Sequence, residues 1–185
     1  MAALQLLTFL NLVLININGA YNNQGQLRDA IDSLSTKPDI IGLTETKLKL
    51  NETIHVPGYT CWHAPDAKGI AGTVYLIHDR LMPVCTSITP PESDEHTSTG
   101  HTQWIRILSS NRPLYMSLSY ISPNDPENYT LTINKLIHDA TELSKSGDCI
   151  HMGDFNNTGA GNGTKFNRFL KALGLTHQYV QHRMH

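Results

Sequence analysis

Apolar residues recur along the chain with two different periods, which predict where strands and helices lie. Residues 5–17 form a nearly continuous apolar, branched run, and Gly19 interrupts it. Such a run is typical of a strand that is buried on both faces. Between Gln24 and Ser35 the apolar residues return at helical spacing, and Pro38 closes the segment. The chain is therefore expected to open with a buried strand followed by a helix.

The segment DIIGLTET at residues 39–46 predicts a second strand. Period two places Ile41, Leu43 and Glu45 on one face of it. The middle of the chain then holds short apolar segments separated by clusters of Gly, Pro, Ser and Asp, including the polar loop PPESDEHTSTGH. These segments predict four more strands, near residues 58–63, 70–78, 83–88 and 103–108.

The last third of the chain returns to long periodic segments. In PLYMSLSYISP, the apolar or aromatic residues at positions 114, 116, 118 and 120 alternate with a more polar set, which predicts a half-buried strand. Asp125 and Pro126 resemble the N-cap and first residue of a helix that reaches about Ser144. The segment DCIHMGD predicts the next strand, and an amphipathic helix ended by Gly174 follows.

The order of these elements favours one α+β domain covering residues 1–185, in which helices face sheets with a large antiparallel component. The hydrophobic content of 39% and the charged content of 16% are ordinary for a globular protein with one core. The sequence contains no internal repeat and no linker-like segment.

Charge and cysteine content limit the classes of function. The formal net charge is −2, so a nucleic-acid partner cannot be argued from overall charge. Three cysteines without a CxxC pair favour free thiols in a reducing compartment, nuclear or cytoplasmic. The opening apolar run lacks a basic n-region and is too short to span a bilayer, so a buried strand is favoured over a targeting segment and secretion is not expected.

Polar residues stand at the ends of four predicted strands, where a purely structural strand would not favour them. They are Asn16, Glu45, Tyr120 and the pair Asp154 and Asn156. Because a sheet is rigid where its strands end and its loops begin, catalytic groups often gather at such positions. The five residues are therefore candidates for one site.

The five side chains are the kinds that phosphoryl transfer requires. Mg²⁺ takes oxygen ligands and is typically held by one or two carboxylates, which Glu45 and Asp154 offer. Amides such as Asn16 and Asn156 donate to phosphate oxygens without adding charge. The hydroxyl of Tyr120 can orient a phosphate, and such reactions depend mainly on positioning and on charge stabilisation.

Each residue also has a structural interpretation when taken alone. Asn16 precedes a glycine and fits a turn, Glu45 fits a solvated strand end, and Tyr120 fits the core. Residues 154–164 fit a long polar turn that lacks the Gly-Lys-Ser/Thr of a nucleotide-binding loop. Other candidates are favoured as structural or solvated. They are His63, His78 and His151, which lack zinc-like spacing, and Lys165, Arg168 and Lys171 on the last helix.

Four motifs together resemble a known family. LININGA, PDIIGLTETK, LSYISPND and IHMGDFNN occur in this order. They are similar to the successive motifs of the exonuclease/endonuclease/phosphatase superfamily, to which deoxyribonuclease I belongs. The combination of NING, TETK and GDFN is most similar to the endonuclease domain of LINE-type non-LTR retrotransposons. The resemblance extends from about residue 7 to residue 180.

The resemblance implies a four-layer α/β/β/α sandwich of two mixed sheets and Mg²⁺-dependent phosphodiester hydrolysis, with Mn²⁺ as a possible substitute and DNA as the substrate. It implies that Glu45 is the chief metal ligand, with Asn16 and Asp154 beside it. Tyr120 and Asn156 are implied to contact the phosphate, and Asp154 to orient the attacking water. Gly72 matches the glycine that opens an inner strand. No membrane is implied.

The family pattern continues with an Asp-containing motif and a terminal Ser-Asp-His, and neither occurs in these 185 residues. The resemblance thus implies a domain that is incomplete at its C-terminus. His177, His182 and His185 precede the place of the missing motifs and are expected to be tail residues. Three functions follow: a DNA-nicking endonuclease of a retroelement, a phosphatase of the same fold, or a catalytically impaired remnant. Protein partners are not predicted.

Overall fold

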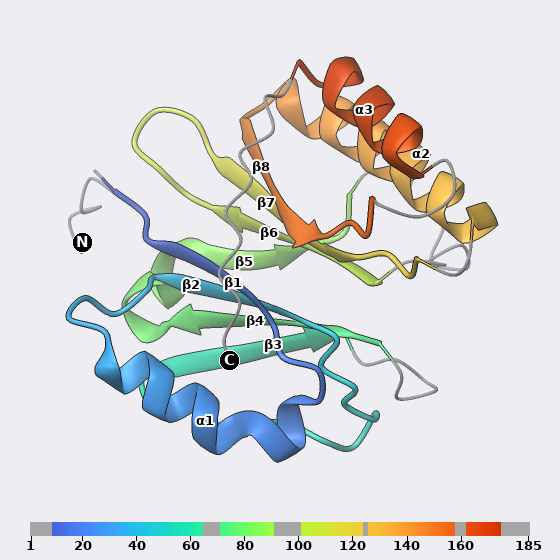
Figure 1. The fold of residues 1–185 in the computed structure, drawn as a ribbon. Coiled ribbons are helices and arrows are strands. Elements are labelled where there is room, and N and C mark those ends of the chain that lie inside the picture. The colour runs from blue at the N-terminus through green and yellow to red at the C-terminus, as the bar shows by residue number, and fades with distance from the viewer. Residues whose placement is uncertain (1–8, 65–70, 91–100, 124–125, 158–161, 175–185) are drawn as a thin grey trace.

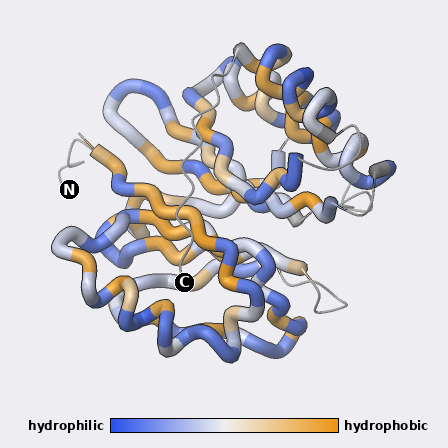
Figure 2. The backbone as a smooth tube through the Cα atoms, in the orientation of Figure 1, coloured by the Kyte–Doolittle hydropathy of each residue, from blue (hydrophilic) through white to orange (hydrophobic). Residues whose placement is uncertain are grey.

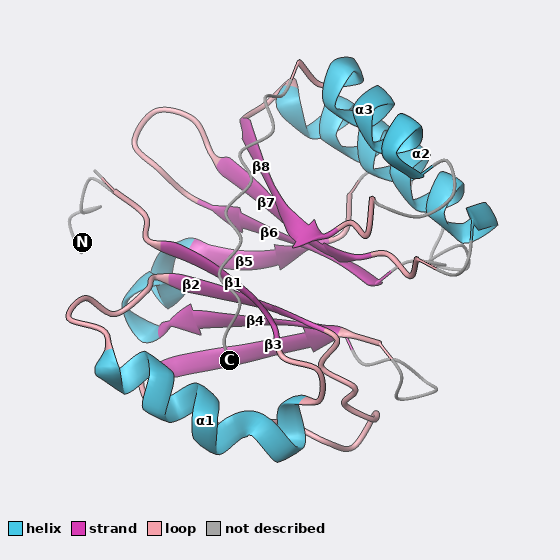
Figure 3. Cartoon of the chain, in the orientation of Figure 1, coloured by secondary structure: helices cyan, strands magenta, loops and turns pink. Residues whose placement is uncertain are grey.

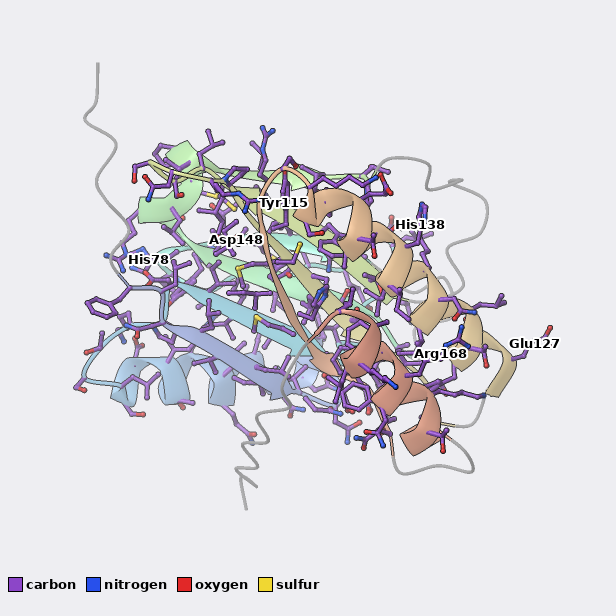
Figure 4. The ribbon with its side chains drawn as sticks, turned by 90° about the horizontal axis from the view of Figure 1, so that it is seen from above. His78, Tyr115, Glu127, His138, Asp148 and Arg168 are labelled. Carbon is purple, nitrogen blue, oxygen red and sulfur yellow. The ribbon has the colours of Figure 1, made fainter. Side chains whose placement is uncertain are left out.

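The protein has four layers, in which two β-sheets stack face to face and helices cover both outer surfaces (Figures 1 and 3). The computed structural model describes residues 9–64, 71–90, 101–123, 126–157 and 162–174. Helix α1 covers one sheet, and α2 and α3 lie side by side over the other (Figure 4). This arrangement confirms the predicted α+β sandwich.

The first sheet has the strand order β1-β2-β4-β3. Strands β1 and β2 are parallel, and the other two pairs are antiparallel, so the sheet is mixed. Residues 20–33 form α1 between β1 and β2, and this helix packs on the sheet through Leu27 and Ile31. The bounds are β1 Leu12–Asn16, α1 Ala20–Ser33, β2 Ile40–Thr44, β3 Tyr59–Ala64 and β4 Thr73–His78.

The second sheet has the strand order β5-β6-β7-β8 and is also mixed, because only β7 and β8 run parallel. A 3₁₀ turn leads from the first sheet into it. The bounds are η1 Asp79–Val84, β5 Cys85–Ile88, β6 His101–Ile107, β7 Leu114–Tyr120, α2 Pro126–Ser144, β8 Asp148–Asp154 and α3 Asn162–Ala172.

Apolar residues form three cores, one under α1, one between the sheets and one under α2 and α3. Figure 2 shows the strands as mostly apolar and the helices as mixed, which fits helices that bury only one face. Successive residues of β2 and β4 enter different cores: Val74 and Leu76 lie under α1, whereas Tyr75 and Ile77 lie between the sheets. The inner strands are therefore buried on both faces.

The prediction for the first strand is wrong in its extent and in its burial. Only Leu12–Asn16 form a strand among the described residues of the 5–17 segment. Among the described strands, β1 is the end strand of its sheet and pairs only with β2, and Leu14 is 42% exposed. The segment is apolar because its side chains contact two cores. Within the described part of the chain, however, no strand covers the outer edge of β1.

Two further predictions need correction. The first helix begins at Ala20, before the first periodic apolar residue, because the Ala20 N–H donates to the Thr46 carbonyl and fixes the chain there. β7 is not half-buried. Both of its faces are covered, and Ser117 and Ser119 are fully buried. Their hydroxyls are satisfied by hydrogen bonds with His151 Nδ1 (2.8 Å) and Thr102 Oγ1 (3.0 Å).

The other predicted elements are confirmed to within three residues at each end; the candidates at 70–78 and 83–88, for example, begin at Thr73 and Cys85. The loop at 91–100, Asp125 and the histidines at 177, 182 and 185 lie outside the described residues. The three cysteines are free thiols. No helix in the described ranges is long and apolar enough to cross a membrane.

His151 predicts how the stability of the fold depends on pH. Its ring lies edge-on between Trp104 and Phe169, and burial lowers the pKa of His151 from 6.5 to about 4. The unfolded chain therefore binds a proton that the folded chain excludes as pH falls from about 6.5 to 4. We expect the free energy of unfolding to fall by about 3 kcal/mol over this range from His151 alone.

Urea unfolding at pH 7 and at pH 4.5 measures this effect. In His151→Gln the difference between the two pH values is expected to shrink, even though the variant is less stable overall. His55 is exposed, so His55→Gln should retain the difference seen in the wild type. An equal difference in His151→Gln and the wild type would contradict the buried neutral histidine.

Candidate active site

The ends of β1, β2, β7 and β8 meet at one end of the sandwich. The Asn16 Nδ2 amide at the end of β1 donates to Glu45 Oε1 at 2.8 Å and to Asp154 Oδ2 at 2.9 Å. Asn16 and Asp154 are 138 positions apart and belong to different sheets. One amide group thus joins two carboxylates that follow strands of different sheets.

Glu45 reaches this site because the backbone departs from strand geometry. Period two predicted Glu45 on the same face as Ile41 and Leu43, which pack in the core under α1, and that part of the sequence prediction is wrong. The strand ends at Thr44, and Glu45 adopts a left-handed conformation with φ 50°. This turn directs the carboxylate to Asn16, on the side of the sheet opposite to Ile41 and Leu43.

Backbone hydrogen bonds hold the two loops that carry Asn16 and Glu45 against each other. The N–H groups of Ile17, Gly19 and Ala20 donate to the carbonyls of residues 44, 45 and 46, at 3.1, 2.8 and 2.7 Å. The parallel pairing of β1 and β2 therefore continues past the strand ends. These hydrogen bonds fix the left-handed conformation of Glu45.

Tyr120 ends β7 with its side chain 9% exposed. Burial, and then the negative charges of Glu45 and Asp154, raise the pKa of Tyr120 to about 12. A hydrogen bond with Glu45 adds to the shift. The phenol therefore stays protonated at neutral pH and serves as a hydrogen-bond donor in the site.

Strand β8 places Asp154 directly opposite Tyr120 in the parallel register. The preceding Gly153 allows a very close approach of the two strands, because a Cβ at this position would lie 2.3 Å from the Ser119 carbonyl oxygen. Asn156 follows with a left-handed φ of 42°. Its N–H donates to Asp154 Oδ1 at 3.3 Å, and its Nδ2 donates to the Ile121 carbonyl at 3.0 Å.

The structure thus joins Asn16, Glu45, Tyr120 and Asp154 directly, and ties Asn156 to Asp154. Sequence reasoning missed other polar groups close by. The hydroxyls of Thr44 and Thr46 flank Glu45, are fully buried and have no hydrogen-bond partner within the described residues. Asn18 and Lys47 form a hydrogen-bonded pair beside the site. The lysine stands in the TETK motif, which was the only signal for it.

The donor set fits a hard divalent cation such as Mg²⁺. Two carboxylates at close quarters are what such an ion typically takes from a protein, with waters and substrate oxygens completing its coordination. No group of three or more His, Cys, Asp or Glu side chains suited to a metal occurs in the described ranges. The Asn16 Oδ1 accepts from the Asn18 N–H at 3.2 Å, so ligation by Asn16 would use the second lone pair of that oxygen.

Sequence comparison identifies the class of protein to which this site belongs. The sequence profile of the Endonuclease/Exonuclease/phosphatase family matches residues 13–180. The chain is a member of this family, as the four motifs predicted. No curated protein matches the chain in sequence.

Solved structures share the fold at low sequence identity. The AP endonuclease LMAP from Leishmania major has a TM-score of 0.65 and 15% identity, over 89% of this chain and 66% of that one. The 3′ phosphatase NExo from Neisseria, bound to a product DNA hairpin, has a TM-score of 0.60 and 14% identity, over 89% and 71%. The endonuclease domain of TRAS1, a telomere-specific non-LTR retrotransposon, has a TM-score of 0.52 and 14% identity, over 88% and 70%. This chain spans about two thirds of the length of these proteins.

Proposed function

We propose that the protein is a Mg²⁺-dependent phosphodiester hydrolase that nicks DNA, as the endonuclease of a non-LTR retroelement. The observation that carries this proposal is the pair of hydrogen bonds from Asn16 to Glu45 and Asp154. They bring two carboxylates from separate sheets into one solvent-accessible site. Family membership supports hydrolysis of a phosphate ester.

Glu45 and Asp154 would hold Mg²⁺, or Mn²⁺ in its place, with Asn16 beside them. A cation bound there supplies charge neutralisation on a phosphate oxygen. Asp154 would orient the attacking water and accept its proton as the new P–O bond forms, while the P–O bond to the departing strand oxygen breaks and that oxygen takes a proton from solvent. The carboxylate is suited to this role because the hydrogen bonds from Asn16 and from the Asn156 N–H fix its plane.

Tyr120 and Asn156 position the phosphate. The Tyr120 phenol stays protonated and donates to a phosphate oxygen, on which negative charge increases during the reaction. The hydrogen bond to the Ile121 carbonyl holds the Asn156 amide at the end of β8. Its role in binding a phosphate oxygen follows from the family motif.

DNA is the proposed substrate. The NExo structure contains a product DNA hairpin, and TRAS1 is a retrotransposon whose endonuclease domain shares the fold. The net charge of −2 gives no general attraction to nucleic acid, so binding has to come from the cation and from local groups.

Nicking of supercoiled plasmid with Mg²⁺ and with a chelator tests the proposal. Asp154→Asn keeps the shape of the side chain and removes its charge, so we expect nicking to fall by roughly 10²- to 10⁴-fold. Asp148 stands at the other end of the same strand, with its side chain 72% exposed (Figure 4). Asp148→Asn is the matched control and should nick like the wild type.

Two results would reject the proposal. Nicking that survives the chelator would exclude a metal-dependent enzyme. Nicking by Asp154→Asn at the wild-type rate, with both well above a protein-free control, would place the activity outside this site. If the folded chain binds Mg²⁺ but neither it nor Asp154→Asn nicks above the protein-free control, the protein is the impaired remnant that the sequence also allows.

A further inference from the structure

Asn18 and Lys47, which the proposed function does not use, have the same left-handed backbone conformation as two residues of the site. Among the described residues, four that are not glycine have a positive φ: Asn18 (46°), Glu45 (50°), Lys47 (53°) and Asn156 (42°). Conformations of this kind cost free energy and cluster at functional sites, where the surroundings enforce them. Glu45 and Asn156 belong to the site, and Asn18 and Lys47 are the remaining pair.

Asn18 and Lys47 contact each other beside the two carboxylates. The Lys47 ammonium donates to Asn18 Oδ1 at 2.5 Å, and the Asn18 N–H donates to Asn16 Oδ1 at 3.2 Å. A continuous chain of hydrogen bonds therefore leads from Lys47 through Asn18 and Asn16 to Glu45 and Asp154. The Lys47 N–H donates to the Ala71 carbonyl at 2.6 Å, which fixes the base of the side chain.

The charge of Lys47 is not neutralised by the described protein. Lys47 makes no ion pair with a carboxylate in the ranges that the structure describes. An ammonium has three donors, and Asn18 takes one of them. The amide contact orients the group without cancelling its charge, and the ordering of a long side chain before binding reduces the entropy cost of holding an anion.

We infer that Lys47, oriented by Asn18, binds a phosphate group next to the one that is hydrolysed. The inference rests on the proposed function and sharpens its substrate class, because a second phosphate subsite selects a polynucleotide over a compound with a single phosphate ester. In a chain of net charge −2, a local cation of this kind supplies attraction that the overall charge does not.

Equilibrium binding of a fluorescein-labelled DNA duplex, followed by anisotropy in Ca²⁺ at several salt concentrations, tests the inference without turnover. Lys47→Ala is expected to raise the Kd about tenfold. The slope of log Kd against log salt should fall by about 1, as for the loss of one phosphate contact. Lys47→Arg should restore most of the affinity. Lys49 is exposed on the same loop, and Lys49→Ala is the matched control that should bind like the wild type.

A second measurement separates substrate binding from a purely structural role. Rates are compared on the duplex and on bis(4-nitrophenyl) phosphate, a diester with no neighbouring phosphate. Lys47→Ala should lower the rate on the duplex, relative to the rate on bis(4-nitrophenyl) phosphate, about tenfold. An equal loss on both substrates would mean that Lys47 only organises the loops, and this would overturn the inference.

The binding data also distinguish failure of the inference from failure of the proposed function. Equal Kd values and salt slopes for Lys47→Ala and the wild type would overturn the inference, whether or not the chain nicks DNA. Duplex binding that weakens in Lys47→Ala, in a chain that hydrolyses neither substrate, would support the subsite and reject the hydrolase.

Discussion

Replacement of Glu45 by Gln should lower Mg²⁺-dependent nicking by roughly 10²- to 10⁴-fold, equivalent to losing several kcal/mol of charge stabilisation in the transition state. Gln retains an oxygen that can accept from Asn16 Nδ2, so the loop arrangement should survive. The substitution removes one of the two negative charges that favour binding of a divalent cation. The affinity for Mg²⁺, measured by titration calorimetry, should weaken together with the rate.

Glu45→Gln also has an expected effect that is independent of catalysis. Glu45 is one of the negative charges that raise the pKa of Tyr120, after burial. Removing this charge should lower the pKa of Tyr120, which spectrophotometric titration of the phenols can measure. An unchanged Mg²⁺ affinity in Glu45→Gln would exclude Glu45 as a metal ligand.

Glu127→Gln provides the control for Glu45→Gln. Glu127 is exposed near the start of α2 and points away from the protein (Figure 4). The same change of charge at this position should leave both nicking and Mg²⁺ affinity at the level of the wild type. A loss in Glu127→Gln as well would mean that overall charge, rather than the site, determines the response.

Gly153→Ala should damage both the fold and the site. A Cβ at Gly153 would lie 2.3 Å from the Ser119 carbonyl oxygen and 3.1 Å from the Ser119 nitrogen. Real Cβ atoms do not approach backbone this closely, so β7 and β8 must move apart. We expect the free energy of unfolding to fall by about 1–3 kcal/mol, as in other overpacked interiors.

The expected loss of nicking in Gly153→Ala is larger than the loss of stability suggests. Ser119 precedes Tyr120 and Gly153 precedes Asp154, so the strands must separate where these two site residues face each other. A displacement of about 1 Å in a catalytic group can cost about 10² in rate. Denaturant unfolding and plasmid nicking under conditions where the variant is folded measure the two effects.

Gly25→Ala is the matched control for Gly153→Ala. Gly25 lies within α1, and a Cβ there would meet no atom within 4 Å. Because alanine restricts the unfolded chain and favours helix, this variant should be more stable by about 0.5–1 kcal/mol and should nick normally. If Gly153→Ala were as stable and as active as the wild type, the close approach of the two strands would not constrain the site.

Local patterns in the sequence were sufficient to predict most elements of the fold. β8 and α2 lie where periodicity and the proline at 126 placed them, because these signals depend on neighbouring residues. The motifs also predicted that Asn16, Glu45, Tyr120 and Asp154 would gather, since each stands at a strand end. The order of strands in each sheet requires pairing between distant segments, which periodicity does not contain.

Tertiary contacts determined the features that the sequence predicted wrongly or not at all. Alternation placed Glu45 on the same face as Ile41 and Leu43, but hydrogen bonds between two loops hold it in a left-handed turn and direct it to Asn16. The sequence pattern predicted that the serines of β7 face solvent, because no local signal shows that they will form hydrogen bonds with His151 and Thr102. The pairing of Asn18 with Lys47 likewise exists only once the loops meet. Periodicity records the direction of each side chain along one strand, whereas burial and left-handed turns depend on segments far away in the chain.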